Sequence, residues 1–132
     1  MNVVFDTQAL LIFYLGEAGA GRVADLLKQV LDRKISGYMN IVNLAELYYI
    51  LSRKSKKIAE EKEKSLRNFG VKMVPVINGV LWKEAAILKT SGSMSLADAF
   101  AAATAKTMKC RLITGSDPEF DSVAGIQIER VR

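Results

Sequence analysis

The sequence predicts an α/β fold with a central, mostly parallel sheet of about five strands. Short apolar runs of strand length alternate along the chain with longer stretches in which apolar residues recur at helical spacing. The chain has 132 residues, of which 50% are hydrophobic and 25% are charged, and no linker-like segment divides it. These values are typical of one globular domain, so we expect a single domain over residues 1–132.

The first half of the chain alternates between the two patterns. The apolar run VVF predicts a buried strand, and ALLIFYL and GRVADLLKQVLD after it have helical spacing. A second strand leads into NLAELYYILSRK, and a charged segment with a helical repeat follows. The predicted elements are a strand at 2–6, helices at 9–15 and 21–32, a strand at 36–39, and helices at 43–54 and 56–69.

The second half continues the alternation after a break at Gly70. LWKEAAILK and the alanine-rich SLADAFAAATAKTMK predict helices, while the apolar run RLIT predicts a buried strand. Glycine and proline residues separate the segments, notably in SGS at 91–93 and GSDP at 115–118. The predicted elements are a strand at 72–76, helices at 81–89 and 95–109, and strands at 111–114 and 126–129.

The absence of histidine restricts the chemistry more than any other feature of the composition. Without imidazole the chain cannot form a Ser-His-Asp or Cys-His site, and it lacks histidine ligands for zinc. Its single cysteine, Cys110, cannot form an internal disulfide and is expected to be a buried apolar residue. Catalysis would therefore depend on carboxylates, hydroxyls, lysine or a bound ion. The net charge of +5 favours a polyanion or an acidic protein as partner.

Four acidic residues, each at a predicted helix start or turn, are candidates for a functional site: Asp6, Glu46, Asp98 and Asp117. Each also has a purely structural explanation, because an acid at a helix start can accept hydrogen bonds from free N–H groups. Asp98 follows Ser95 by three residues, as in a capping box, and Glu46 follows Asn43 at the same spacing. Asp117 precedes a proline, which is typical of a turn or an N-cap.

The positions of these acids relative to the strands indicate a shared site. In an α/β fold with parallel strands, helix starts that follow strands lie at the carboxyl edge of the sheet, where ligands bind. Asp6, Glu46 and Asp117 each follow a predicted strand, so we expect them at one edge. Carboxylates within about 4 to 6 Å of one another repel unless a cation lies between them. Oxygen ligands alone favour Mg²⁺ or Mn²⁺ over zinc.

Three motifs, spread in a fixed order over the whole chain, are similar to those of a known family: VVFDTQALL, NLAELYYIL and SLADAFAAATAKTMKCRLITGSDPEF. With them the chain resembles the PIN-domain ribonucleases, and among these the VapC-type toxins of toxin–antitoxin pairs. The resemblance implies a three-layer α/β/α sandwich with an acidic active site that binds Mg²⁺ or Mn²⁺. It also places hydroxyls near the metal at Thr7 and at Thr114, with Ser116 as a further candidate. Its catalytic and metal-binding acids fall on Asp6, Glu46, Asp98 and Asp117.

The spacing of the last motif differs from the family pattern. The family commonly has a threonine two residues before the last acid, whereas Thr114 lies three residues before Asp117. Either Ser116 occupies an added position or Asp117 is displaced. Glu119 and Asp121 are alternative acids for this place, although we expect Glu119 to point to solvent or to cap a short helix.

The resemblance implies a metal-dependent endoribonuclease, the toxin of a toxin–antitoxin pair. Asp6 and Asp98 would be direct ligands, Glu46 and Asp117 would bind a second ion or its waters, and Thr114 would orient a water or a carboxylate. One alternative is a PIN-like scaffold that binds RNA or protein without turnover; another is an RNA-processing or flap nuclease of the same fold. A haloacid-type phosphatase is excluded, because Gln8 occupies the position of its second acid.

The expected partners are an RNA substrate, a small antitoxin protein and a second copy of the chain. LLIFYL and LYYIL provide apolar surfaces for such contacts, or else belong to the core. No stretch approaches the roughly 18 apolar residues of a membrane span, and no signal segment precedes the first strand, so we expect a cytoplasmic protein.

The basic run RKSKK at 53–57 has two interpretations. As a solvated helix face, it would form i,i+4 pairs with the acids of the following EEKEK. Alternatively, its four basic residues, Arg53, Lys54, Lys56 and Lys57, would contact the RNA backbone.

Overall fold

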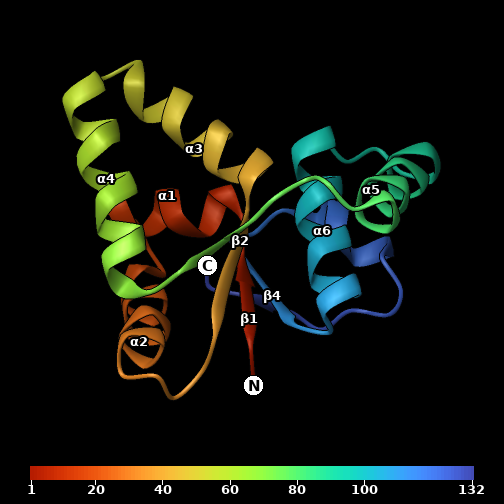
Figure 1. Cartoon of the computed structure of the whole chain (residues 1–132), viewed down its shortest axis with the longest axis horizontal. Coiled ribbons are helices and arrows are strands. Elements are labelled where there is room, and N and C mark those ends of the chain that lie inside the picture. The colour runs from red at the N-terminus through yellow and green to blue at the C-terminus, as the bar shows by residue number, and fades with distance from the viewer.

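The computed structural model describes all residues, 1–132, and contains one parallel sheet of five strands. β1 lies in the centre and every neighbouring pair is parallel, so the predicted α/β class is confirmed (Figure 1). The strand order is β3-β2-β1-β4-β5. The strands are β1 (Val3–Phe5), β2 (Gly37–Asn40), β3 (Lys72–Val74), β4 (Arg111–Thr114) and β5 (Ile128–Arg130).

Helices cover both faces of this sheet and complete the three-layer α/β/α sandwich. The first four helices lie on one side, and the last two lie on the other (Figure 1). All six predicted helices and five predicted strands are present, with ends that differ by a few residues. The helices are α1 (Thr7–Leu15), α2 (Ala20–Leu31), α3 (Ile41–Ser52), α4 (Lys56–Phe69), α5 (Gly79–Ser91) and α6 (Leu96–Met108), and a short 3-10 helix, η1, spans Pro118–Ser122.

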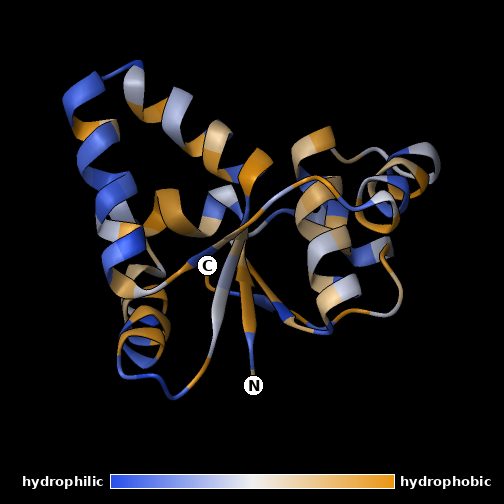
Figure 2. Cartoon of the chain, in the orientation of Figure 1, coloured by the Kyte–Doolittle hydropathy of each residue, from blue (hydrophilic) through white to orange (hydrophobic).

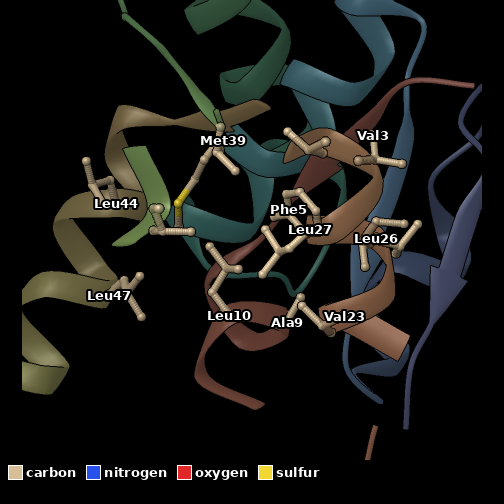
Figure 3. Close-up of a cluster of buried hydrophobic side chains, with 14 of the residues drawn as sticks. Val3, Phe5, Ala9, Leu10, Val23, Leu26, Leu27, Met39, Leu44 and Leu47 are labelled. Carbon is tan, nitrogen blue, oxygen red and sulfur yellow. The ribbon is translucent and has the colours of Figure 1, made fainter. Parts of the chain in front are cut away.

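The alternation of side chains along β1 divides the core into two layers. Val3 and Phe5 point into a cluster of 16 buried residues that α1 to α4 complete (Figure 3). Val4 points to the opposite face, as the period of a strand requires, and packs in a cluster of 7 buried residues with α6 and Phe120. A third cluster joins α5 to α6. Both faces of β1 are therefore buried, which fixes the position of its carboxyl end.

Most of the apolar segments that we considered as contact surfaces belong to this core. In LLIFYL, Leu10 and Ile12 are fully buried, and in LYYIL, Leu47 and Leu51 are buried while Tyr49 is exposed. The charged helix α4 instead presents a mainly hydrophilic surface, and Gly70 ends it in the left-handed conformation (Figure 2). No helix combines the length and the apolarity that a membrane crossing requires.

The strand order creates a switch point between β1 and β4. From β1 the chain adds β2 and β3 on one side of β1, and it then crosses over to add β4 and β5 on the other side. Ligands of doubly wound sheets bind at the carboxyl ends of strands at such a point. Because the crossover helices run back against the parallel strands, their N-termini lie at this same carboxyl edge.

Candidate active site

Asp6 lies at the switch point, between the end of β1 and the start of α1. Its side chain is only 2% exposed. Oδ1 accepts a hydrogen bond from the Ala9 N–H at 2.8 Å, and Oδ2 accepts one from the hydroxyl of Thr114 at the end of β4. Asp6 is therefore the N-cap of α1, and its carboxylate also ties β1 to β4 at the edge of the sheet.

The second strand ends in an asparagine that caps α3. The Asn40 Oδ1 accepts from the Val42 N–H at 2.8 Å, and its Nδ2 donates to the Thr104 hydroxyl on α6 at 2.9 Å. The capping role that the spacing to Glu46 suggested for Asn43 is therefore wrong, because Asn43 lies inside the first turn of α3. Glu46, one turn further along the helix, is half-buried and free of a capping role.

Asn43 connects three elements around the site, and sequence reasoning missed this role. It is 1% exposed, its Nδ2 donates to the Ala97 carbonyl at 2.9 Å, and its own carbonyl accepts from the Thr7 hydroxyl at 3.0 Å. The Asn43 Oδ1 is buried without a hydrogen-bond partner. A buried amide oxygen normally has a donor, so this atom can accept a hydrogen bond from a bound water or ligand. The signal in the sequence was a second asparagine one turn after the one that ends β2.

The closest group of acids comes from α6 and η1. Carboxylate oxygens of Asp98, Asp117 and Glu119 all lie within 4.8 Å of one another. The Ser95 hydroxyl accepts from the Asp98 N–H at 3.1 Å, which confirms Ser95 as the cap of α6, while the Asp98 carboxylate is left to join the group. Asp117 caps η1 by accepting from the Glu119 N–H at 2.9 Å.

The expectation that Glu119 points to solvent or caps a short helix is wrong. The backbone turn that Asp117 caps brings the Glu119 side chain back towards α6, where it is half-buried. The alternative acid Asp121 is not in this group, since its mostly exposed carboxylate pairs with Arg130. Ser116 is exposed, and no hydrogen bond joins its hydroxyl to the acids.

Burial and mutual repulsion disturb the ionisation of two of these acids. Burial raises the pKa of Asp6 from 3.8 to about 7; the Thr114 hydroxyl and the Ala9 N–H lower it, and the charges of Asp98 and Glu46 raise it further. Burial also raises the pKa of Asp98 to about 6, against the hydrogen bond of Ser95, and the charges of Asp117, Glu119 and Glu46 add to the increase. Asp98 on α6 thus interacts with acids of the three other chain segments that meet here.

The structure brings the four predicted acids into one electrostatic group and adds a fifth. Asp98 lies at its centre, with Asp117 and Glu119 closest to it, and with Asp6 and Glu46 near enough to raise pKa values. The direct partners of Asp98 are therefore on η1 and not on β1. Thr114 contacts the group through Asp6, whereas the hydroxyl of Thr7 is used by the Asn43 carbonyl.

The donor set fits a hard divalent cation. Every side-chain donor in the group is a carboxylate oxygen. Mg²⁺ and Mn²⁺ prefer such ligands. Burial is the main cause of the raised pKa values of Asp6 and Asp98, and the smaller part that comes from repulsion between the acids would be relieved by a cation among them.

The raised pKa values predict an unusual dependence of stability on pH for the metal-free protein. The folded state binds protons on Asp6 and Asp98 more tightly than the unfolded chain does. The free energy of unfolding therefore decreases as the pH rises from the pKa values of the unfolded chain to those of the folded protein. Stability is expected to fall by a few kcal/mol as the pH rises from about 4 through about 7, mostly through the buried Asp6, because solvent screens the contribution of the partly exposed Asp98.

The measurement is urea denaturation with EDTA across this pH range, for the wild type and for Asp6→Asn. The variant keeps a hydrogen-bonding side chain without a charge, so its stability should lose most of this dependence on pH and keep only the smaller contribution of Asp98. Added Mg²⁺ should restore the stability of the wild type on the alkaline side. A wild type that becomes more stable as the pH rises through this window would contradict the electrostatic description of the site.

Comparison with known proteins places the chain in a family. A comparison with curated protein sequences gives no match. Among solved structures, a toxin–antitoxin complex from Klebsiella pneumoniae contains a chain with a TM-score of 0.76 at 17% identity, and the alignment covers 99% of this chain and 98% of that chain. VapBC2 from Rickettsia felis, bound to a DNA fragment from its promoter, gives a TM-score of 0.76 at 16% identity, with 98% of each chain covered.

A third structure, of DNA-bound VapBC from Salmonella typhimurium, gives a TM-score of 0.76 at 12% identity and covers 100% of this chain and 99% of that chain. At such low identities the likeness is one of fold. The sequence itself matches the family model of the PIN domain over residues 3–126, which include all five acids of the group. The chain therefore belongs to the PIN-domain family.

Proposed function

We propose that the protein is a metal-dependent endoribonuclease that hydrolyses RNA phosphodiester bonds with Mg²⁺ or Mn²⁺. The observation that carries this proposal is the group of Asp98, Asp117 and Glu119, with carboxylate oxygens within 4.8 Å of one another at the carboxyl edge of the sheet. Acids collected from distant segments at the cost of raised pKa values are typical of functional sites. Membership of the PIN-domain family supports a nuclease.

The residues of the site divide into ligands and supports. Asp98, Asp117 and Glu119 would hold the cation, with Asp6 and Glu46 completing its surroundings. Thr114 fixes the Asp6 carboxylate, and Asn43 fixes the start of α6 through the Ala97 carbonyl. When bound, a divalent ion would neutralise phosphate charge and lower the pKa of a bound water. This chemistry requires no imidazole, in agreement with a chain that has no histidine.

Cleavage of RNA by the purified protein tests this function. A mixture of labelled single-stranded RNAs should be cut internally in the presence of Mn²⁺ or Mg²⁺, and EDTA should abolish the cleavage. Melting temperature, measured in parallel, should rise with the same ions, since a ligand that binds the folded state stabilises it. A folded preparation that cuts no RNA, with a melting temperature that no divalent ion raises, would remove the enzyme and favour a non-catalytic scaffold.

We further propose that the protein acts as a cytoplasmic toxin that a small antitoxin protein neutralises. The support is the fold shared with chains of toxin–antitoxin complexes, together with coverage of nearly the whole of both chains. Expression of the wild type in a bacterial host should arrest growth, and expression of Asp98→Ala should not. Equal growth of the two strains would favour a housekeeping nuclease.

We propose that the protein forms a homodimer through a surface made by α5 and the residues just before it. Ile77 and Val80 are 86% and 67% exposed and line a common hollow beside Leu81, while Ile87 lies two turns beyond Val80 on the same side of the helix and is 61% exposed. Exposed apolar side chains gathered in one place are typical of contact surfaces. We assign the second copy to this surface, and light scattering of Ile87→Glu should then report a monomer where the wild type is a dimer.

A further inference from the structure

The basic run at the junction of α3 and α4 is not neutralised by the protein itself. Its four basic side chains are exposed, and none of them forms an ion pair. The acids one turn later on α4 do not pair with this run, and Glu60 instead accepts a hydrogen bond from the Tyr48 hydroxyl at 2.7 Å. The run, which comprises Arg53, Lys54, Lys56 and Lys57, is therefore solvated as expected, but the i,i+4 charge pairs expected with the acids of α4 are not formed.

Helix α3 connects this basic run to the acidic site. The helix leaves the carboxyl edge of the sheet near Asn43 and extends away from it to the junction with α4 (Figure 1). Glu46 and Arg53 are seven residues apart, so they lie on nearly the same side of the helix, about 10 Å from each other along its axis. This side is not the one that packs into the core, which carries Leu44, Leu47 and Leu51.

An exposed aromatic ring lies between these two charged residues. Tyr49 is 47% exposed, and the Arg53 guanidinium lies over its ring at 4.9 Å from the centroid. Tyr49 is one turn from both Glu46 and Arg53, so it belongs to the same side of α3. A tyrosine ring held by a guanidinium is a flat, partly apolar surface on which an unpaired base can stack.

We propose that this side of α3, from Glu46 through Tyr49 to Arg53, together with the lysines beyond it, binds the single-stranded RNA next to the bond that is cleaved. The inference rests on the proposed nuclease function and adds the path that the bound RNA strand follows from the acidic site, which is along α3. The four positive charges contact phosphates, and Tyr49 stacks on a base. Duplex RNA is disfavoured, because its bases are already stacked and paired.

Binding of a fluorescent single-stranded RNA to the Asp98→Asn protein, measured by anisotropy over a range of salt concentrations, tests the proposal without turnover. Replacement of the four basic residues of the run by glutamine should make the dependence of log K on log salt concentration shallower by about 3. Each phosphate contact on a single strand contributes about 0.7 to the magnitude of this slope. Tyr49→Ala should weaken binding by about tenfold and leave the salt slope unchanged.

A second protein with four glutamines is the matched control, because it loses the same charge at exposed lysines elsewhere: Lys28, Lys34, Lys72 and Lys89. It should keep most of the salt slope. An equal loss of slope in both proteins, or an unchanged slope in the α3–α4 protein, would overturn the inference. Cleavage is measured separately, on the chain with Asp98 intact. If this chain cuts RNA but the four glutamines at the α3–α4 junction leave the salt slope of binding unaltered, only the proposed α3 surface is rejected. A chain that cuts no RNA rejects the nuclease function instead.

Discussion

Asp98→Asn is expected to lose roughly a thousandfold in the rate of RNA cleavage, because the loss of several kcal/mol of charge stabilisation corresponds to a factor of this size. Asp98 is the centre of the acidic group, since its carboxylate lies with those of Asp117 and Glu119 and its pKa responds to Glu46 as well. The substitution keeps the size of the side chain and the Ser95 cap of α6.

The same substitution should stabilise the metal-free protein, which distinguishes a lost ligand from a damaged fold. A neutral amide removes a repulsive charge that raises the pKa of Asp6. Single-turnover cleavage and thermal melting in EDTA measure the two effects. Asp121→Asn is the matched control, because Asp121 is a near neighbour on η1 that pairs with Arg130 outside the group. An active Asp98→Asn protein, or an equal loss of rate in the control, would contradict the assignment.

Phe120→Ala is expected to cost about 3 to 5 kcal/mol of unfolding free energy, the usual range for a buried phenylalanine replaced by alanine. Phe120 is fully buried and packs with Val4 and Leu112 between the sheet and α6. It is the buried residue of η1 that anchors this short helix to the core; Glu119 directly precedes it, and Asp117 caps the same helix. The cavity should therefore loosen the acidic group as well as the fold.

Urea denaturation measures the loss of stability, and the rise of melting temperature with Mn²⁺ measures the effect on the site. Phe120→Leu retains most of the volume, so its loss should be smaller and its response to Mn²⁺ should be close to that of the wild type. If Phe120→Ala does not fold, the leucine variant still provides the comparison. A loss below about 1 kcal/mol in Phe120→Ala would show that η1 does not depend on this side chain.

The sequence was sufficient to predict the fold because local patterns and chain order determine it. Hydrophobic periodicity gave the strands and helices, and parallel strands brought Asp6, Glu46 and Asp117 to one edge of the sheet. Topology alone also places Asp98 there, because α6 runs back against β4 and its N-terminus therefore lies at the carboxyl edge. From the sequence, only the family resemblance places Asp98 in the site.

The details that could not be predicted depend on contacts between distant segments. Glu119 joins the group because Asp117 accepts its N–H and turns the backbone towards α6. Asn43 is essential to the geometry because its amide meets the Ala97 carbonyl, 54 residues later in the chain. The spacing of Asn43 from Asn40 marks a polar residue at the start of α3, but it does not reveal a partner on α6, and both contacts become evident only once the helices are packed.

The central claim is that carboxylates from distant parts of the chain share one divalent cation, and direct titration of the protein with Mn²⁺ tests it. At a pH about one unit above the Asp6 pKa of about 7, the wild type should bind Mn²⁺ saturably, and Mg²⁺ should compete for the same site. Asp98→Asn should bind at least tenfold more weakly, and Asp121→Asn should bind as the wild type does. Absence of binding in the wild type, or equal affinity in Asp98→Asn, would contradict the account.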